Sequence, residues 1–494
     1  MKRIASVVLA AAVAVIASAH VGSPDVVFDG TAGAYPVRVI VRPPDVVPGL
    51  AQIIVRVEAA DVEHVLIRPV YWRTGAAGSP KADETSRVAG QPRIFTGQLW
   101  LMSRGAYSVY VTVQGTRGSG TAIVPVDALA TGRLPLPRGL GVILLILGGV
   151  LVAGLATIVR AASGEALMPP GEVVDTRTRK RAARAAAIAV PVLALALLGG
   201  ATWWNAVDAQ YQRTMYRRPA VTATFATSAG HRTVRLVVRD TARFRTLTSP
   251  IVPDHGKMMH LFLIGDPDMS VFAHLHPAET DSLTFTGEVP WLPAGRYRLF
   301  GDVTTESGMS LTVSRVIALP EAGGVIAPSD SDDSWTRAST VPVIGRGESS
   351  ALGHGFTMQW AGDSVIHARA PVDLDFTVRN SSGAVAALEP YMGMAAHAVV
   401  MRDDGSVFIH LHPMGTISTA AQRAFELRDR GDTTPQGRLA SQALDSAPAM
   451  MMPMRMRGAL SIPYEFPKPG RYRVWVQVEA AGHILTGVFD VNVH

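Results

Sequence analysis

Histidines recur at one spacing in two stretches of the chain. The first stretch begins at His260, continues through an apolar run and an acidic turn, and ends in His274-Leu275-His276-Pro277. The second repeats this order from His397 to His410-Leu411-His412-Pro413. Because side chains alternate between the two faces of a strand, both histidines of each His-Leu-His triplet share a face. Each stretch therefore predicts a β-hairpin that carries three imidazoles on one side.

The register of each hairpin is left open between two pairings. Depending on which residues form the turn, the leading histidine, His260 or His397, faces either the first or the second histidine of its triplet. Directly opposed strand residues have Cβ atoms about 4.5–5.5 Å apart. Three imidazoles at that spacing can converge on one ion at about 2.0–2.1 Å, so both pairings are compatible with a metal site.

Methionines near the histidines favour copper over zinc, because thioethers are ligands for copper(I) and not for zinc. The candidate ligands are His260, His274, His276, His397, His410, His412, Met258 and Met394, with Met259, Met269 and Met392 also nearby. His255 is a further candidate ligand, and His483 a weaker one. Copper is the expected ion and zinc the alternative. The competing interpretation is that these histidines are structural and bond only to backbone or water.

A methionine-rich run, Met450 to Met456, lies in the same chain. It is interpreted either as a mobile copper(I) ligand or as an apolar patch that covers a sheet. The chain has no cysteine, which excludes disulfides, thiolate metal sites and cysteine nucleophiles. Its pI of about 9.7 does not indicate nucleic-acid binding, because the arginines are scattered along alternating segments without a basic-aromatic motif.

Two apolar runs predict transmembrane helices, at residues 139–159 and 185–204, each about the length that crosses a bilayer. The segment between them, 160–184, is rich in arginine, which by the positive-inside tendency places it in the cytoplasm. Residues 1–19 predict a cleaved signal peptide. The expected location is the inner (cytoplasmic) membrane, with the β domains facing the periplasm or the outside.

Cleavage after Ala19 would make His20 the mature N-terminus. An N-terminal histidine can chelate copper(II) through its amine and its imidazole. The alternative is that cleavage merely happens at this residue, and the sequence leaves both open.

The rest of the chain alternates in the strand manner and predicts a mainly β fold of three immunoglobulin-like β-sandwich domains plus two transmembrane helices. A Gly-x-Tyr strand start occurs at Gly105, Gly295 and Gly470, and its tyrosine is expected to form a tyrosine corner. The predicted segments are a β-sandwich at 20–132, a His-hairpin β-sandwich at 219–319, an acidic linker at 320–340, and a second His-hairpin β-sandwich at 341–494 with an insert at 414–457. A short helix is expected within that insert, from Thr419 to about Gly431.

The His-x-His-Pro hairpin, preceded by a histidine and followed by Pro-x-Gly-Arg-Tyr-Arg, resembles bacterial envelope proteins with YtkA-like or FixH-like immunoglobulin-type domains, often described as heavy-metal-associated. The first β domain is loosely similar to the CopC copper-resistance type, which can also begin with histidine after signal cleavage. This resemblance implies an envelope location and metal binding.

These observations predict a membrane-anchored extracytoplasmic protein that binds, buffers or delivers a metal. Its expected partners are the membrane and an envelope protein that gives or receives the ion, with no nucleic acid. The alternative is a structural or interaction module of an envelope complex without metal. No catalytic signature is present, neither a Ser-His-Asp order nor a P-loop nor a dinucleotide fingerprint, so no enzyme activity is expected.

Overall fold

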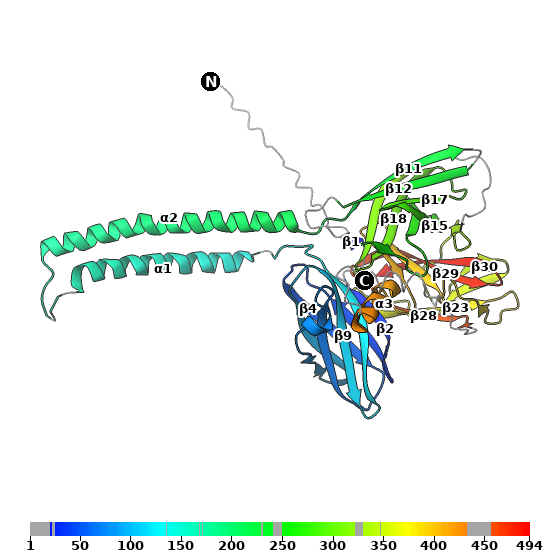
Figure 1. The fold of residues 1–494 in the computed structure, drawn as a ribbon, viewed down its shortest axis with the longest axis horizontal. Helices are drawn as coiled ribbons and strands as arrows, with labels where there is room; N and C mark the ends of the chain where they lie inside the picture. The colour runs from blue at the N-terminus through cyan, green and yellow to red at the C-terminus, as the bar shows by residue number, and fades with distance from the viewer. Residues whose placement is uncertain are drawn as a thin grey trace, which may run out of the picture. The chain divides into compact units, whose positions relative to one another are not determined.

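The fold is that of a computed structural model, shown in Figure 1, and it is mainly β. It describes residues 20–21, 25–134, 136–166, 168–169, 171–228, 231–240, 249–321, 330–345, 347–431 and 456–494. Within these residues there are six sheets of four or more strands, one two-stranded sheet and two long apolar helices. The chain divides into two compact units, one formed by Met1–Leu129 with Arg217–His494 and the other by Ala130–Tyr216.

The first sheet pair, built from residues 26–128, combines sheets of order β2-β3-β4-β8-β7 and β10-β9-β5-β6. Alternate residues of β4 are buried, as the strand pattern predicts, whereas β9 is buried along most of its length. Its elements are β2 Val26–Ala32, β3 Tyr35–Arg42, β4 Gly49–Val57, β5 Val62–Tyr71, the 3₁₀ turn Ala76–Gly78, β6 Asp83–Glu84, β7 Ser86–Val88, β8 Gln91–Leu101, β9 Gly105–Gly115 and β10 Gly118–Ala128.

The second sheet pair, built from residues 220–337, combines β11-β12-β17-β16 with β13-β18-β14-β15-β20, and β19 pairs with β18. Its strands are β11 Ala220–Ser228, β12 His231–Arg239, β13 Ile251–Val252, β14 His260–Gly265, β15 Val271–Leu275, β16 Ala278–Asp281, β17 Thr284–Glu288, β18 Gly295–Thr305, β19 Ser310–Leu319 and β20 Ser334–Arg337.

β20 lies within the segment expected to be a linker, yet it pairs antiparallel with β15. The polar, acidic composition of this segment predicts a linker. Composition holds no information about the unpaired edge of β15, with which the segment pairs. Backbone hydrogen bonds such as Ala338 N to Ser270 O, 2.9 Å, continue the pairing.

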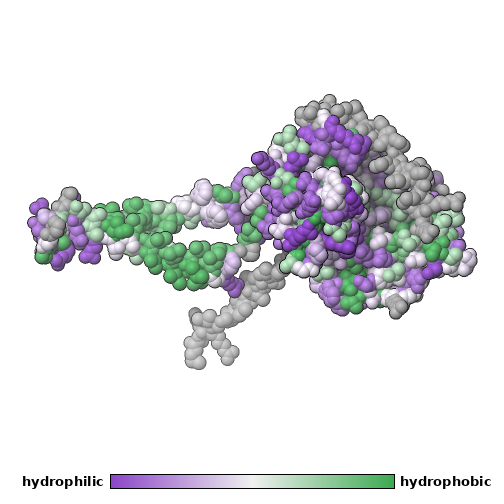
Figure 2. Space-filling model, turned by 90° about the horizontal axis from the view of Figure 1, so that it is seen from below, coloured by the Kyte–Doolittle hydropathy of each residue, from purple (hydrophilic) through white to green (hydrophobic). Residues whose placement is uncertain are grey.

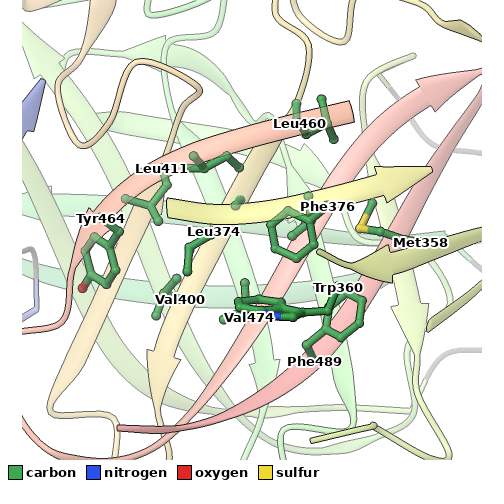
Figure 3. Packing of buried hydrophobic residues seen from close by; sticks show 14 of the residues in the cluster. Met358, Trp360, Leu374, Phe376, Val400, Leu411, Leu460, Tyr464, Val474 and Phe489 are labelled. Carbon is green, nitrogen blue, oxygen red and sulfur yellow. The ribbon is translucent and has the colours of Figure 1, made fainter. Parts of the chain in front are cut away.

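The third sheet pair, built mainly from residues 349–493, combines β21-β22-β23-β28 with β1-β26-β25-β29-β30. Its core lies between these sheets and includes Trp360, Phe376 and Phe489 (Figure 3). Its elements are β1 His20–Val21, β21 Ser349–Gly353, β22 Phe356–Trp360, β23 Pro371–Arg379, β24 Ala387–Leu388, β25 His397–Arg402, β26 Val407–Leu411, α3 Thr419–Asp429, β27 Met456–Arg457, β28 Ala459–Glu465, β29 Gly470–Ala480 and β30 His483–Val493.

Both histidine hairpins form, and the same one of the two open registers is adopted in each. Leu261 pairs with Leu275, which sets His260 opposite the second histidine of its triplet, His276. The second hairpin shows the matching register, with Ala398 opposite Leu411.

The histidine-bearing faces of the two hairpins pack against each other inside one unit. The opposite faces, which carry residues such as Val400 and Leu411, pack in their own sandwich. Between the hairpins lies a second apolar cluster, the inter-hairpin core, formed by Phe262, Ile264, Met269, Phe272, Phe300, Val399, Met401, Phe408, Trp475 and Val488. Histidines predicted to line one hairpin face are therefore enclosed between two sheets.

The Gly-x-Tyr strands behave as the tyrosine-corner interpretation expects. Tyr297 donates its hydroxyl to Pro293 O and Tyr472 to Lys468 O, both at 2.7 Å. In the first sheet pair the Tyr107 hydroxyl instead accepts from Ser103 N at 3.0 Å. The tyrosines thus tie each strand to the chain four residues earlier.

The second unit contains two helices, α1 Arg138–Glu165 and α2 Thr176–Thr214, both long and apolar enough to cross a membrane. Figure 2 shows apolar residues covering much of both. They are longer than the predicted spans, so much of the basic segment 160–184 is helical. Asp175 caps α2 by accepting from Thr178 N at 2.8 Å, and the Arg- and Ala-rich residues after it are good helix formers.

Replacing Phe408 by Ala should weaken the packing of the second sheet pair on the third. Phe408 is fully buried and stacks on Phe300 at 3.9 Å between ring centroids. Deleting a buried ring costs about 3–5 kcal/mol. Chemical denaturation should show a loss of this size, whereas Val385→Ala, at a site 47% exposed, should change little. A Phe408→Ala loss as small as that of the control would contradict this packing.

Candidate metal centre

Seven imidazoles, six from the two hairpins and one from the turn before the first hairpin, meet in one buried cluster, the histidine cluster. They are His255, His260, His274, His276, His397, His410 and His412. Rings from different sheet pairs lie as close as rings of one hairpin. The ring centroids of His260 and His410 are 5.0 Å apart, and those of His255 and His412 are 4.8 Å apart. The two sites expected from the sequence therefore form a single centre shared by the two sheet pairs.

Two triads in the histidine cluster have the geometry to hold an ion, with ligand atoms within 4.8 Å of one another. The first triad is His260, His274 and His276, all from one hairpin, as predicted. The second triad is His255, His397 and His412. It takes His255 from the opposite sheet pair in place of His410, which lies between the triads, 5.5 Å from His274 and 4.6 Å from His412 by ring centroids.

Two of these imidazoles, His276 and His412, have a hydrogen-bond acceptor at one ring nitrogen and none at the other. Asp333 Oδ1 lies 3.0 Å from His276 Nδ1, and Ile417 O lies 3.1 Å from His412 Nδ1. In His410 the nearest carboxylate oxygen, Asp302 Oδ2, lies 3.7 Å from Nδ1, which is too far for a hydrogen bond. In all three the Nε2 atom is buried and lacks a hydrogen-bond partner. Metal-bound histidines use the same arrangement, donating from one nitrogen and ligating with the other.

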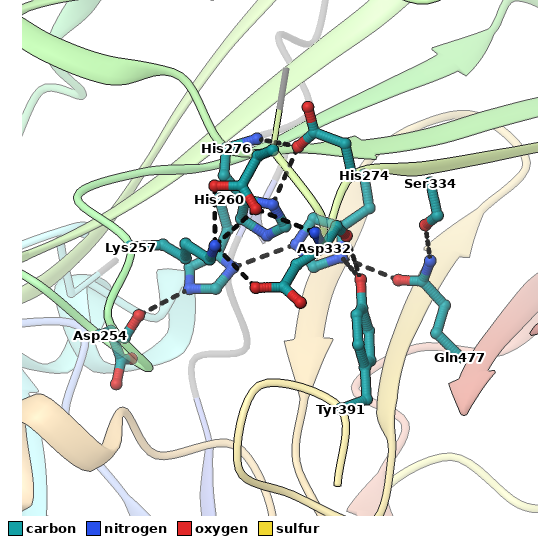
Figure 4. Close-up of polar contacts among 11 residues, drawn as sticks. Asp254, Lys257, His260, His274, His276, Asp332, Ser334, Tyr391 and Gln477 are labelled. Atoms are coloured by element: carbon teal, nitrogen blue, oxygen red, sulfur yellow. Dashed lines mark hydrogen bonds and ion pairs between the residues drawn. The ribbon is translucent and has the colours of Figure 1, made fainter. Parts of the chain in front are cut away.

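The other imidazoles of the cluster differ in their hydrogen-bond partners. His260 lies 3.0 Å from His274 through Nδ1 and Nε2, and its own Nε2 lies 3.2 Å from Asp254 O. His274 Nδ1 lies 2.8 Å from Gln477 Oε1 and 3.4 Å from the Tyr391 hydroxyl (Figure 4). Both ring nitrogens of His397 are buried without a partner. An unsatisfied buried polar atom costs about 1–3 kcal/mol, which an ion would relieve.

Burial keeps the cluster uncharged. It lowers the pKa of His260 and His412 to about 4 and that of His274, His276, His397 and His410 well below the usual value. Desolvation disfavours the imidazolium form and neighbouring histidines add to the shift. Neutral imidazoles are the form that binds metal. The contact of His276 with Asp333 is therefore a hydrogen bond rather than an ion pair.

A third possible ligand group, His276 with Asp330 and Asp333, lies beside the first triad. Its acidic side is already engaged, since Lys257 Nζ lies 2.6 Å from Asp330 and 2.7 Å from Asp332. Figure 4 shows these contacts next to His260 and His276. We therefore assign these aspartates to positioning Lys257 and His276.

Other sequence candidates lie outside the histidine cluster or outside the described side chains. Met258 and Met394 are half-buried in the turns that precede β14 and β25, and their role as ligands stays a prediction. His483 is exposed and stacks on His354 at 3.9 Å, away from the cluster. The backbone of His20 pairs with Val407, but its side chain and residues 450–455 lie outside what the structure describes.

Sequence reasoning missed two polar side chains that lie beside the imidazoles. Asp302 and Gln477 occupy matching positions on β18 and β29, opposite the leading histidine of each hairpin. The signal that could have found them is the repeat itself, because both follow the Gly-Arg-Tyr-Arg motif at the same distance.

Comparisons with known proteins add little about function. Residues 350–494, which include the second hairpin, match a family described as a domain of unknown function, DUF8832. No curated protein matches the chain. These findings do not bear on the YtkA-like, FixH-like or CopC-like resemblance, which stays a prediction.

Solved structures that the chain matches are distant. A tetra-tandem repeat from the extending region of a large adhesion protein is 8% identical, with 91% of this chain and 71% of that chain covered and a TM-score of 0.15. Native E. coli alpha-2-macroglobulin is 10% identical, with 95% and 23% covered and a TM-score of 0.19. An ICAM-5 D1-D4 ectodomain fragment is 10% identical, with 93% and 83% covered and a TM-score of 0.15. Scores this low carry no argument.

The metal-free protein should lose stability as the pH falls. Histidines with depressed pKa values stay neutral when folded but take up protons when unfolded, so the unfolded state is favoured from about pH 6.5 down to about pH 4. Each such histidine contributes about 1.4 kcal/mol per pH unit in this window. Burial raises the pKa of Asp127, Asp302 and Asp333 to about 7 and that of Asp25 to about 6, and these four carboxyl groups act in the opposite direction but are fewer than the histidines.

Denaturation with a chelator at pH 7.5 and at pH 5 measures this dependence. His412→Leu removes one titrating group and should give a shallower slope than the wild type. A wild-type protein equally stable at both pH values, or a variant with an unchanged slope, would contradict neutral burial of the cluster.

Proposed function

We propose that the protein is a membrane-anchored extracytoplasmic metal-binding protein whose histidine cluster holds copper, with zinc as the alternative ion. The observation that carries the proposal is the set of buried ring nitrogens without partners on His276, His397, His410 and His412. Purely structural histidines would find partners for these atoms, because leaving them unsatisfied costs free energy. The proposed role is binding, buffering or delivery, and not catalysis.

Copper is favoured by the ligands at hand. Three imidazoles suit copper and zinc alike, because a water can complete the four-coordinate shell of zinc. The methionines in the turns before the two hairpins, in a chain without thiolates, favour copper(I). Burial of the cluster means that an ion leaves only when the two hairpins separate, which suits handover to an envelope partner.

The membrane assignment is part of the same proposal. It is supported by the lengths and apolar surfaces of α1 and α2 and by the arginines between them. With the basic segment in the cytoplasm, both chain segments that flank the helix pair lie on the opposite side.

Metal analysis of the full-length protein in detergent tests binding directly. After loading with copper and removal of free ion, the wild type should retain about two equivalents, one for each triad. The double variant His276→Gln, His412→Gln should retain little, because each triad loses a ligand. The matched control His354→Gln, His483→Gln removes an exposed histidine pair and should bind as the wild type does. Equal retention by all three proteins would refute the proposed site.

Single cysteines test the orientation, since the chain contains none of its own. Glu172→Cys lies between the helices and Ser381→Cys on a turn of the third sheet pair, and both positions are exposed. In spheroplasts of a bacterial host, a membrane-impermeant thiol reagent should label position 381 and should reach position 172 only after lysis. The reverse pattern would contradict the topology.

A further inference from the structure

The second and third sheet pairs repeat each other residue by residue around the histidine cluster. The turn before the first hairpin, Asp254-His255-Gly256-Lys257, corresponds to Tyr391-Met392-Gly393-Met394 before the second. Each turn closes through reciprocal backbone bonds between its first and fourth residues, at 3.0 and 3.0 Å in the first and at 2.8 and 3.1 Å in the second. Corresponding residues of the two turns therefore have the same backbone position relative to their hairpins.

Contacts across the inter-hairpin core are reciprocal, which shows an approximate two-fold relation between the sheet pairs. Arg298 Nη1 donates to Asp404 O, in the turn of the second hairpin, at 2.6 Å. Its counterpart Arg473 donates from Nη1 to Met269 O, in the turn of the first, at 2.9 Å. Both are the second arginine of a Gly-Arg-Tyr-Arg motif.

The aromatic and histidine contacts obey the same relation. Phe300 stacks on Phe408, and the equivalent pair Trp475 and Phe272 is also stacked, with centroids 3.9 and 5.1 Å apart. In the same way His274 contacts Gln477 of the other sheet pair, and the equivalent His410 contacts Asp302.

One pair of equivalent residues differs in chemistry. His255 and Met392 both have positive φ, 53° and 49°, and each precedes a glycine with φ near 80°, so their side chains leave the turn in the same direction. His255 reaches across to the opposite hairpin and joins His397 and His412. Met392 is buried, 8% exposed, and its neighbour Tyr391 places its hydroxyl 3.4 Å from His274 Nδ1.

We infer that the Met392 thioether reaches across to His260 and His276 and is a further ligand of the first triad. This inference rests on the proposed metal-binding function. The first triad then offers a thioether sulfur together with imidazole nitrogens, and the second triad offers imidazole nitrogens alone. Because thioether sulfur selects copper(I), the two triads differ in the ion that they prefer. The first retains copper(I), and the second accepts copper(II) or zinc as well.

Copper X-ray absorption and an anaerobic copper(I) competition titration with a chromophoric chelator test this assignment on the full-length protein. The wild type loaded with copper(I) should show a sulfur neighbour of copper, and Met392→Leu should lose it. In the titration, Met392→Leu should weaken one of the two equivalents by roughly tenfold or more and leave the other unchanged. Met358→Leu is the control, because Met358 is buried in the core of the third sheet pair.

A second variant tests the inference independently of whether Met392→Leu folds. His255→Met should add a sulfur neighbour at the second triad and raise its preference for copper(I). A wild type that binds copper with nitrogen neighbours only, or a Met392→Leu protein with both affinities unchanged, overturns the role of Met392 while the proposed function stands. A wild type that takes up no copper overturns both.

Discussion

The face-to-face packing of two histidine hairpins is the interaction on which the rest of the unit depends. Each hairpin has two buried faces, one in its own sandwich and one against the other hairpin. Phe300 stacks on Phe408 across this contact, and Phe262 stacks on His274 with ring centroids 4.3 Å apart. The arginines of the Gly-Arg-Tyr-Arg motifs then fix the hairpin turns from across the interface.

Excluding water from seven imidazoles has a cost and a chemical consequence. Desolvation keeps the rings neutral, so their lone pairs are available, while several ring nitrogens have no protein partner. Acceptors such as Asp333 and Ile417 O select the tautomer that leaves Nε2 free. A metal site that costs free energy when empty would couple ion binding to the association of the two sheet pairs.

Much of this centre could be predicted from the sequence, because strand alternation places His274 and His276 on one face whatever the turn does. The mainly β fold and the short helix α3 followed from local patterns as well. What local patterns could not show is which hairpin face meets which partner. The sequence therefore leaves open whether each hairpin holds its own site or the two share one, and it does not show that His255, a further candidate ligand, joins His397 and His412 of the other hairpin. The strand β20 was missed for the same reason, since pairing with a distant edge leaves no local signal.

The central claim is that both hairpins together hold metal at one buried interface. Anomalous diffraction at the copper edge from crystals of the copper-loaded full-length protein measures this most directly. The expected result is two peaks between the sheets of β14 and β25, one beside His276 and one beside His412, with ligands drawn from both sheet pairs at the second. Peaks confined to exposed histidines such as His354 and His483, with none in the histidine cluster, would contradict it.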